Sequence, residues 1–167
     1  MQDRFFKTGL LATAWLLLLA SCILAGRRPN SKTIEESAVR ALMSRWVEAY
    51  QHRDAKRLAA LETQDVEIMD RFGQIHLPSG RDENQKLWSD EFQMMSKNTP
   101  PPAATIDGIR FLLPDVALVQ ASWKFPEGIL LIGGERIPPF CQVDTYVVIK
   151  SQNAWFVAAH NMQEKTP

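Results

Sequence analysis

The apolar residues change their spacing about half-way along the chain, and this change limits the fold more than any other feature. Between residues 34 and 52 they recur at intervals of four: Ile34, Ala38, Leu42, Trp46 and Tyr50. This spacing predicts a helix, and Thr33 with Glu36 has the spacing of a capping box at its start. Later the chain has four runs that are typical of strands, at residues 104–113, 116–125, 142–150 and 155–162. Helices followed by strands predict an α+β domain, with helices on one face of an antiparallel sheet.

Shorter elements are predicted between these segments. Asp54 is a candidate N-cap for a short helix, and residues 66–71 alternate as a strand. A third helix is predicted to begin near residue 79, with one apolar face made of Leu87, Trp88, Phe92 and Met95. Residues 127–139 contain glycines and prolines around an apolar run, which indicates an irregular strand or a flap.

The N-terminal residues have the pattern of a targeting segment. Arg4 and Lys7 precede an uncharged run from Gly9 to Gly26, which is typical of a secretory signal. The tetrapeptide Leu19-Ala20-Ser21-Cys22 resembles a bacterial lipobox, in which the cysteine is lipidated and becomes the first residue of the mature chain. We therefore predict a signal peptide at residues 1–21, a lipid on Cys22, a polar tether at 22–32 and a domain at 33–163.

Two alternatives remain open for this segment. The uncharged run is just long enough for an uncleaved membrane anchor, and a plain secretory signal would be cleaved near Ala25. All three interpretations export the domain, and the lipobox favours a lipid-anchored protein of the cell envelope.

Charge and cysteine content exclude some classes of protein. The 167 residues include 19 basic and 19 acidic side chains, so a broad nucleic-acid footprint is not predicted. Of the two cysteines, Cys141 has no intramolecular partner if Cys22 is lipidated. We interpret Cys141 as a small buried apolar residue.

The order of elements and three short segments resemble the SnoaL-like, SgcJ/EcaC-like branch of the nuclear transport factor two-like superfamily. The segments are residues 46–54 (WVEAYQHRD), 116–119 (VALV) and 155–161 (WFVAAHN). The resemblance implies a cone-shaped fold in which a curved antiparallel sheet wraps around about three N-terminal helices and leaves a conical pocket. It also implies a homodimer that forms through the sheet.

Asp70 is the first candidate catalytic residue. It shares a strand parity with Val66 and Ile68, so its carboxylate is predicted on an apolar face, where it can act as a base. Residues 68–73 also resemble the segment that carries the general base in ketosteroid isomerase relatives. Their oxyanion-donating tyrosine corresponds to Trp46, and no replacement for their second acid is evident. The structural alternative is that Asp70 pairs with Arg71 or caps a turn.

His160 and Asn161 match the polar end of the family's last motif. His160 is a candidate acid or base near neutral pH, and the alternative is a hydrogen-bonded residue at the rim. On the preceding strand Gln142, Asp144 and Tyr146 share one parity. That polar face can line a cavity, a dimer contact or solvent, and we favour solvent or dimer contact.

Aromatic residues supply the candidate ligand contacts. Because the cone is lined by the elements that carry them, we predict ligand-binding roles for Trp46, Tyr50, Trp88 and Trp123, together with Asn161. The three histidines have no metal-ligand spacing, and no phosphate or dinucleotide motif is present, so neither a metal nor a cofactor is predicted.

Two functions follow as hypotheses. The first is an exported domain that binds a small, mainly apolar molecule and carries out cofactor-free acid–base chemistry of the isomerase, cyclase or dehydratase type, with Asp70 as base and His160 as partner. The second is a non-catalytic ligand-binding or dimerisation module.

Overall fold

The structure is a computed structural model that describes residues 31–70, 75–76 and 80–165. The chain divides into two compact units, residues 1–34 and 35–167. The signal peptide, Cys22 and most of the tether lie outside the described residues. The helices are α2 (Ser31–Gln51), α3 (Ala55–Ala60) and α4 (Gly80–Met94). The strands are β1 (Glu62–Met69), β2 (Ile75–His76), β3 (Ala103–Leu113), β4 (Val116–Phe125), β5 (Ile129–Leu130), β6 (Arg136–Ile137), β7 (Phe140–Ser151) and β8 (Ala154–Glu164).

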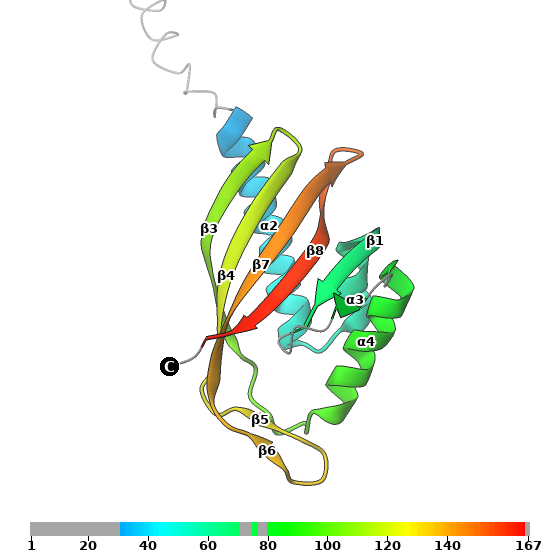
Figure 1. The fold of residues 1–167 in the computed structure, drawn as a ribbon, viewed down its shortest axis with the longest axis vertical. Coiled ribbons are helices and arrows are strands. Elements are labelled where there is room, and N and C mark those ends of the chain that lie inside the picture. Colours follow the sequence, from blue (N-terminus) through cyan, green and yellow to red (C-terminus); the bar gives the residue numbers. More distant parts are fainter. Residues whose placement is uncertain (1–30, 71–74, 77–79, 166–167) are drawn as a thin grey trace, which may run out of the picture. The chain divides into compact units, whose positions relative to one another are not determined.

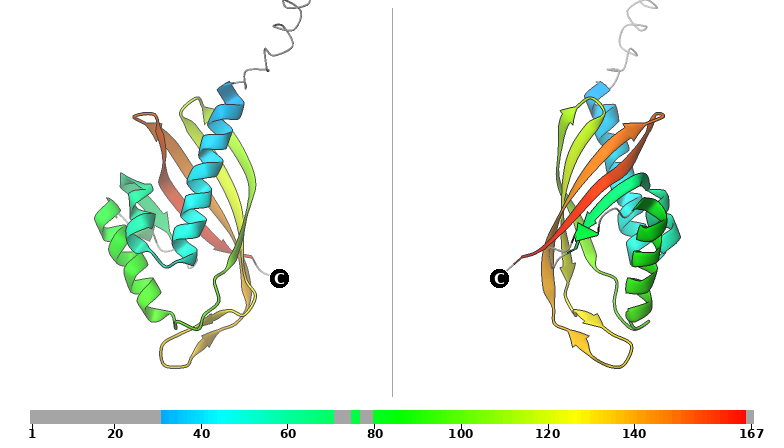
Figure 2. Two further views of the ribbon diagram at one scale, coloured as in Figure 1. Left: turned by 180° about the vertical axis from the view of Figure 1, so that it is seen from behind. Right: turned by 45° about the vertical axis from the view of Figure 1, so that its right-hand side comes forward.

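Six strands form one curved, open sheet in the order β2-β1-β8-β7-β4-β3, and the helices lie on one side of it (Figures 1 and 2). The predicted α+β class is therefore confirmed. The neighbouring pairs are antiparallel with one exception, since β1 runs parallel to β8. Strands β5 and β6 form the predicted flap as a separate two-stranded sheet.

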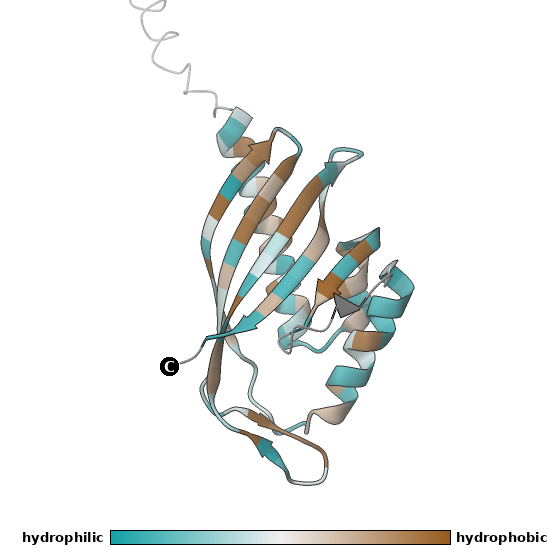
Figure 3. Cartoon of the chain, viewed as in Figure 1, coloured by the Kyte–Doolittle hydropathy of each residue, from teal (hydrophilic) through white to brown (hydrophobic). Residues whose placement is uncertain are grey.

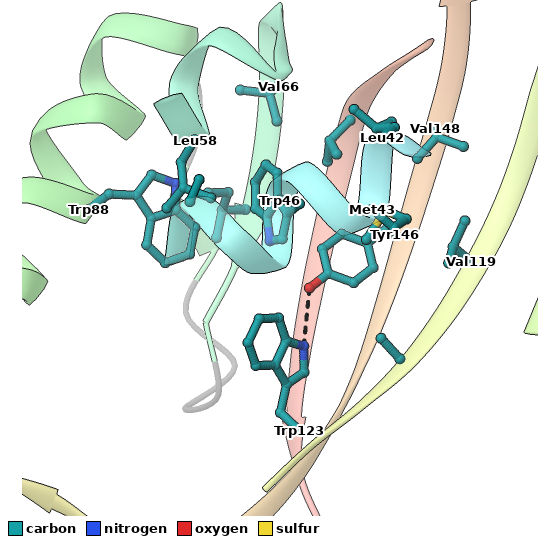
Figure 4. Packing of buried hydrophobic residues seen from close by; sticks show 14 of the residues in the cluster. Leu42, Met43, Trp46, Leu58, Val66, Trp88, Val119, Trp123, Tyr146 and Val148 are labelled. Carbon is teal, nitrogen blue, oxygen red and sulfur yellow. Dashed lines mark hydrogen bonds between the residues drawn. The ribbon is translucent and has the colours of Figure 1, made fainter. Parts of the chain in front are cut away.

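The core lies between α2 and the concave face of the sheet. Its most buried side chains include Leu42, Met43 and Trp46 of α2, which meet Tyr146 and Val148 of β7 (Figure 4). At one end of this interface Glu35 accepts hydrogen bonds from Lys150 (2.6 Å) and from the Trp155 indole (2.9 Å). These contacts hold α2 against β7 and β8.

The strict interval of four was wrong at the start of α2. Val39, Leu42, Met43, Trp46 and Ala49 are buried, whereas Ile34 and Ala38 are exposed. An α-helix has 3.6 residues per turn, so positions four apart rotate steadily around the axis and leave the buried face. The capping box was also wrong, because α2 begins at Ser31 and the Glu36 carboxylate pairs with Arg40 at 2.8 Å.

The second and third helices follow their predicted signals. Asp54 caps α3, since its carboxylate accepts a hydrogen bond of 2.9 Å from the backbone N–H of Arg57. Trp88 and Phe92 are buried on one face of α4, and the face visible in Figure 3 is mainly hydrophilic. The apolar side of α4 therefore faces the interior of the domain.

The flap is attached to the C-terminal end of α4. The backbone N–H of Ser96 bonds to the Leu130 carbonyl at 2.7 Å, and that of Ile132 bonds to the Met94 carbonyl at 2.9 Å. The Thr99 hydroxyl exchanges two further hydrogen bonds with the Leu130 backbone. Strands β5 and β6 are therefore fixed where α4 ends.

Candidate active site

A cavity of about 270 Å³ lies between the helices, the sheet and the flap. This volume is close to the lower end of the range for small-molecule sites. The lining is mainly apolar and comes from α2, α4, β4, the flap, β7 and β8. Its apolar and aromatic members are Trp46, Tyr50, Leu87, Trp88, Met94, Met95, Trp123, Phe125, Ile129, Leu131, Ile137, Tyr146 and Met162. Its polar members are Asp70, Asp90, Glu91, Gln142, Asp144 and His160.

Aromatic rings in edge-to-face contact form much of the wall. The Trp46 ring centroid lies 6.1 Å from that of Trp88 and 5.7 Å from that of Tyr146. Tyr50 contacts Trp123 in the same manner at 5.2 Å. Such contacts stabilise the arrangement of the rings relative to one another.

Asp144 is the centre of a buried polar network. Its Oδ1 accepts a hydrogen bond from the Gln142 amide at 3.0 Å. Its Oδ2 accepts one from the Tyr146 hydroxyl at 3.0 Å and one from His160 Nε2 at 2.9 Å. The Trp123 indole donates in turn to the Tyr146 oxygen at 3.3 Å (Figure 4). Burial, together with the Asp144 carboxylate, raises the pKa of Tyr146 well above its ordinary value, so this hydroxyl remains a donor.

His160 is held in one orientation. Its side chain is 3% exposed, and its ring stacks on Tyr146 with centroids 4.2 Å apart. Because an ionised carboxylate can only accept, Nε2 carries the proton that is shared with Asp144. The other ring nitrogen, Nδ1, is buried and has no hydrogen-bond partner within the described residues. In the neutral ring Nδ1 then holds a lone pair that can accept a proton.

A β-bulge directs His160 into the cavity. In the pairing of β7 with β8, Val147 opposes Ala159 and Val148 opposes Val157, so Ala158 is an extra residue. Without this extra residue, the strict alternation of Trp155 and Val157 would place Asn161 on the inner face. With it, His160 and Met162 line the cavity, and Asn161 does not.

Glu62 lies behind the cavity wall as a second buried acid. Its carboxylate accepts hydrogen bonds from the Trp88 indole at 3.1 Å and from the Asn84 amide at 3.3 Å. Burial raises its pKa to about 7, and the two hydrogen bonds and the nearby His160 and Arg81 side chains only partly oppose this rise. Glu62 therefore exchanges a proton near neutral pH but does not line the cavity itself.

The remaining acids lie near the C-terminal end of α4 and after β1. The Tyr50 hydroxyl donates to Glu91 at 2.9 Å, and Asp90 forms an exposed ion pair with Lys86 at 2.5 Å. Asp70 directly follows β1 and lines the cavity from the side predicted by its parity with Val66 and Ile68. Neither arginine nor lysine is among the described lining residues.

The structure brings most of the predicted site residues together. Asp70 and His160 both line the cavity, as do all four aromatic candidates: Trp46, Tyr50, Trp88 and Trp123. Asn161 does not, for the reason given above, and Cys22 lies outside the described residues. The interpretation of Cys141 was wrong, because its parity on β7 places it on the outer face, where it is exposed.

Sequence reasoning missed the central carboxylate. We favoured solvent or a dimer contact for the face of Gln142, Asp144 and Tyr146, and this was wrong, because all three are buried and line the cavity. The mixture of polar and aromatic residues obscured the fact that the helices cover this face. Glu62 was also missed, since it lies at the junction of α3 and β1, before the alternating part of the strand.

Within residues 31–70, 75–76 and 80–165, no group of three or more histidine, cysteine, aspartate or glutamate side chains is placed to hold a metal ion. In the same ranges, no helix has both the length and the apolar composition needed to cross a membrane.

The fold and the cavity define an α+β domain whose curved, open sheet encloses a small-molecule-sized site. Among solved structures this is the nuclear transport factor two-like fold, also described as cystatin-like. No known sequence family matches the chain, and no curated protein matches it significantly.

Three solved structures show the likeness. A ketosteroid isomerase-like protein from Erwinia carotovora atroseptica is 17% identical, with a TM-score of 0.67 over 78% of this chain and 96% of that one. A candidate scytalone dehydratase from Novosphingobium aromaticivorans is 16% identical, with a TM-score of 0.66 over 81% and 87%. An NTF-2-like protein of unknown function from Shewanella oneidensis is 17% identical, with a TM-score of 0.61 over 77% and 98%. At such low sequence identity, these structural matches establish the fold and nothing about function.

Proposed function

We propose that the cavity binds a small, mainly apolar molecule and that His160 transfers a proton to and from it without a cofactor. The observation that carries this proposal is the arrangement of one ring. Asp144 holds the Nε2–H of His160, and the buried Nδ1 has no partner within the described residues. A carboxylate that orients a histidine in this way is a recurring arrangement for a general base.

The chemistry that fits is proton transfer at a carbon next to a carbonyl group. His160 Nδ1 removes the proton, the carbonyl oxygen gains the negative charge of the enolate, and the proton returns to carbon from the imidazolium. Figure 4 shows the Trp46 indole nitrogen on the side of its ring that faces Trp123 and the Tyr146 hydroxyl. From there Trp46 can donate a hydrogen bond to the enolate oxygen.

This assignment differs from the sequence hypothesis in the identity of the base. Asp70 was the predicted base, with His160 as its partner. The geometry favours His160, because it is fully enclosed and oriented by Asp144, whereas Asp70 is half-buried beyond the end of β1. Asp70 then helps to bind or position the ligand. The ketosteroid isomerase-like and dehydratase-type neighbours support a catalytic use of this fold.

The test is hydrogen–deuterium exchange into 2-tetralone, a bicyclic ketone with acidic C–H bonds. Deuterium incorporation in D₂O near neutral pD is followed by proton NMR, with the protein in catalytic amount. We expect the wild type to accelerate exchange and the His160→Gln variant to lose about 100-fold of that acceleration, the lower end of general-base contributions. Asp144→Asn is expected to lose most of it, and Asp70→Asn considerably less.

His52→Gln is the matched control, because His52 is exposed at the end of α2 and does not line the cavity. Exchange that is equally fast in the wild type and in His160→Gln would contradict the catalytic proposal. If 2-tetralone binds and no exchange is accelerated, the cavity belongs to a non-catalytic ligand-binding module, the alternative predicted from the sequence.

We further propose that the domain is exported and attached to the cell envelope by a lipid on Cys22, on the basis of the lipobox-like residues 19–22. Mass analysis of the membrane fraction is expected to find a mature chain that starts at a diacylated Cys22. A chain with an intact Met1 would contradict lipidation and support an uncleaved anchor, and a soluble chain that starts after Ala25 would support secretion.

A further inference from the structure

We propose that the flap sets the length of the ligand: the cavity takes an elongated ketone whose carbonyl end lies beside His160 and whose apolar far end lies against Ile129 and Ile137. This inference rests on the proposed function, because it assumes that the cavity binds a ketone with its reacting end at His160. It adds the shape of that ketone and the two residues that select for it.

The polar end of the cavity occupies one level of the sheet. His160 lies opposite Tyr146 in the pairing of β8 with β7, and its Nε2 bonds to Asp144 at 2.9 Å. The buried Nδ1 of the same ring has no hydrogen-bond partner within the described residues. A buried acceptor without a donor costs free energy, which a ligand that supplies a proton to it can recover. The polarised end of a ligand therefore belongs at this level.

The opposite end of the cavity lies further along the same strands. Phe125 lines the cavity and pairs with Phe140, at the point where β4 ends and β7 begins. Figure 1 shows the flap beyond this edge of the sheet. Four residues of β7 separate Asp144 from Phe140, and a strand advances by about 3.3 Å per residue, so the two levels are about 13 Å apart. The cavity is therefore elongated along the strands, with His160 near one end and the flap at the other.

The two ends differ in polarity. The lining residues between positions 125 and 137 are Phe125, Ile129, Leu131 and Ile137. All of them are apolar, and Phe125 stacks on Phe140 with ring centroids 4.3 Å apart. At the other end Gln142, Asp144 and Tyr146 bring polar atoms to the lining. A ligand that fits both ends has a polar group at one end and an apolar ring at the other, because burial of that ring next to the flap is favourable.

Ile129 and Ile137 form the end wall. They oppose each other in the pairing of β5 with β6, so their side chains lie on one face of the flap, and both line the cavity. A β-bridge between Met95 and Leu131 and the backbone hydrogen bonds around it attach the flap to the end of α4. The size of the two isoleucine side chains therefore limits how far a ligand can extend from His160.

Three ketones test this limit: cyclohexanone, 4-phenylcyclohexanone and 4-(4-biphenylyl)cyclohexanone. They share one reacting end and differ in the number of benzene rings in line behind it. Dissociation constants with the full-length chain are measured from the quenching of tryptophan fluorescence. We expect 4-phenylcyclohexanone to bind at least about tenfold more tightly than cyclohexanone, because it buries a further ring. The third ring of the biphenylyl ketone needs space that the flap occupies, so this ketone is expected to bind at least about tenfold more weakly than 4-phenylcyclohexanone.

Two substitutions in the end wall are expected to move the limit in opposite directions. Ile129→Ala removes volume from the wall, so it should bind the biphenylyl ketone at least about tenfold more tightly than the wild type does. Ile137→Phe adds volume, so it should lose about tenfold in affinity for 4-phenylcyclohexanone and keep its affinity for cyclohexanone. The control is Ile109→Ala, the same truncation in a residue of β3 that packs against the core and does not line the cavity. It should keep the wild-type order of affinities.

Deuterium exchange shows which end of the ligand lies at His160. We expect exchange at the carbons next to the carbonyl of 4-phenylcyclohexanone, and loss of this exchange in His160→Gln. Ile129→Ala should change the ketone concentration that gives half-maximal exchange and leave the maximal rate within about twofold, because the wall acts on binding and not on proton transfer. If Ile129→Ala does not fold, as judged by thermal unfolding, Ile137→Phe decides the question.

Affinity that rises with every added ring in the wild type would overturn the inference and leave the proposed function standing. An order of affinities that neither flap variant changes, or that Ile109→Ala changes equally, would also overturn it. If the ketones show the expected length dependence and no exchange is accelerated, the catalytic part of the proposed function fails, while the flap variants still decide the length limit. If no ketone binds, including 2-tetralone, the proposed small-molecule site fails together with the inference.

Discussion

At the scale of single residues, the chemistry of the site depends on which buried polar atoms have hydrogen-bond partners and which have none. Asp144 accepts three hydrogen bonds in a buried position, and this carboxylate determines which nitrogen of His160 carries its proton. Glu62 has two donors, and burial outweighs both of them together with the nearby Arg81 and His160, so its pKa rises. The two buried acids therefore differ in their hydrogen-bond donors: Asp144 has three and Glu62 has two.

Glu62 makes the stability of the fold depend on pH. Its pKa is about 7 in the folded chain and 4.5 in the unfolded one, so between these values the folded state binds more protons. The contribution of Glu62 to the free energy of unfolding is therefore largest below pH 4.5. This contribution falls by about 3 kcal/mol as the pH rises through 7. Glu62→Gln removes this titration, so urea denaturation of the variant is expected to depend much less on pH between 5 and 8.

Glu67→Gln is the control for this measurement, because Glu67 is exposed on the same strand. It should keep the pH dependence of the wild type. If Glu62→Gln keeps it too, the carboxyl of Glu62 is ionised throughout this range and the account of its burial is wrong.

At the scale of elements, the helices and strands could be predicted from the sequence because the spacing of their apolar residues is periodic. The strand runs and the buried face of α4 were identified from spacing, and Asp54 was identified as a cap from its side chain and position. The features of the site that could not be predicted depend on single irregularities in this periodic pattern. The bulge at Ala158 decides that His160 faces the cavity and Asn161 does not, and no local signal in the sequence marks it.

The flap contains three glycines with a positive φ, and Gly128 is the one that other backbone atoms approach closely. Gly128 has a φ of +67°, and a Cβ built there would lie 1.9 Å from the backbone oxygen of Ile137. Gly128→Ala is therefore expected to destabilise the protein by about 3 kcal/mol and to weaken ligand binding, because Ile129, Leu131 and Ile137 line the cavity from this segment.

Gly108→Ala is the matched control, since a Cβ at Gly108 meets nothing within 4 Å and its backbone does not require glycine. Thermal unfolding and the fluorescence titration with 2-tetralone measure both effects. Two variants with the same stability and the same affinity would show that the flap does not depend on the conformation of Gly128.

At the scale of the whole molecule, the outer face of the sheet is a candidate interface. We propose that two copies associate through it, as the family resemblance implies, because Val143, Thr145, Val147 and Ile149 of β7 all point outward and are partly exposed. Sedimentation of the wild type is expected to show a dimer and that of Val147→Glu a monomer, since the new charge would be buried in the contact. Gln93→Glu, on the exposed surface of α4 and away from the outer face of the sheet, is expected to remain a dimer. A monomeric wild type at high concentration would contradict the proposal.

The central claim is that the aromatic cavity is a ligand site, and the indole N–H signals of the tryptophans test it most directly. Trp46, Trp88 and Trp123 line the cavity, whereas Trp155 bonds to Glu35 and does not. In ¹H–¹⁵N spectra titrated with 2-tetralone, we expect the first three signals to shift to saturation and the Trp155 signal to remain fixed. Signals that do not move, or a Trp155 shift as large as the others, would contradict the account.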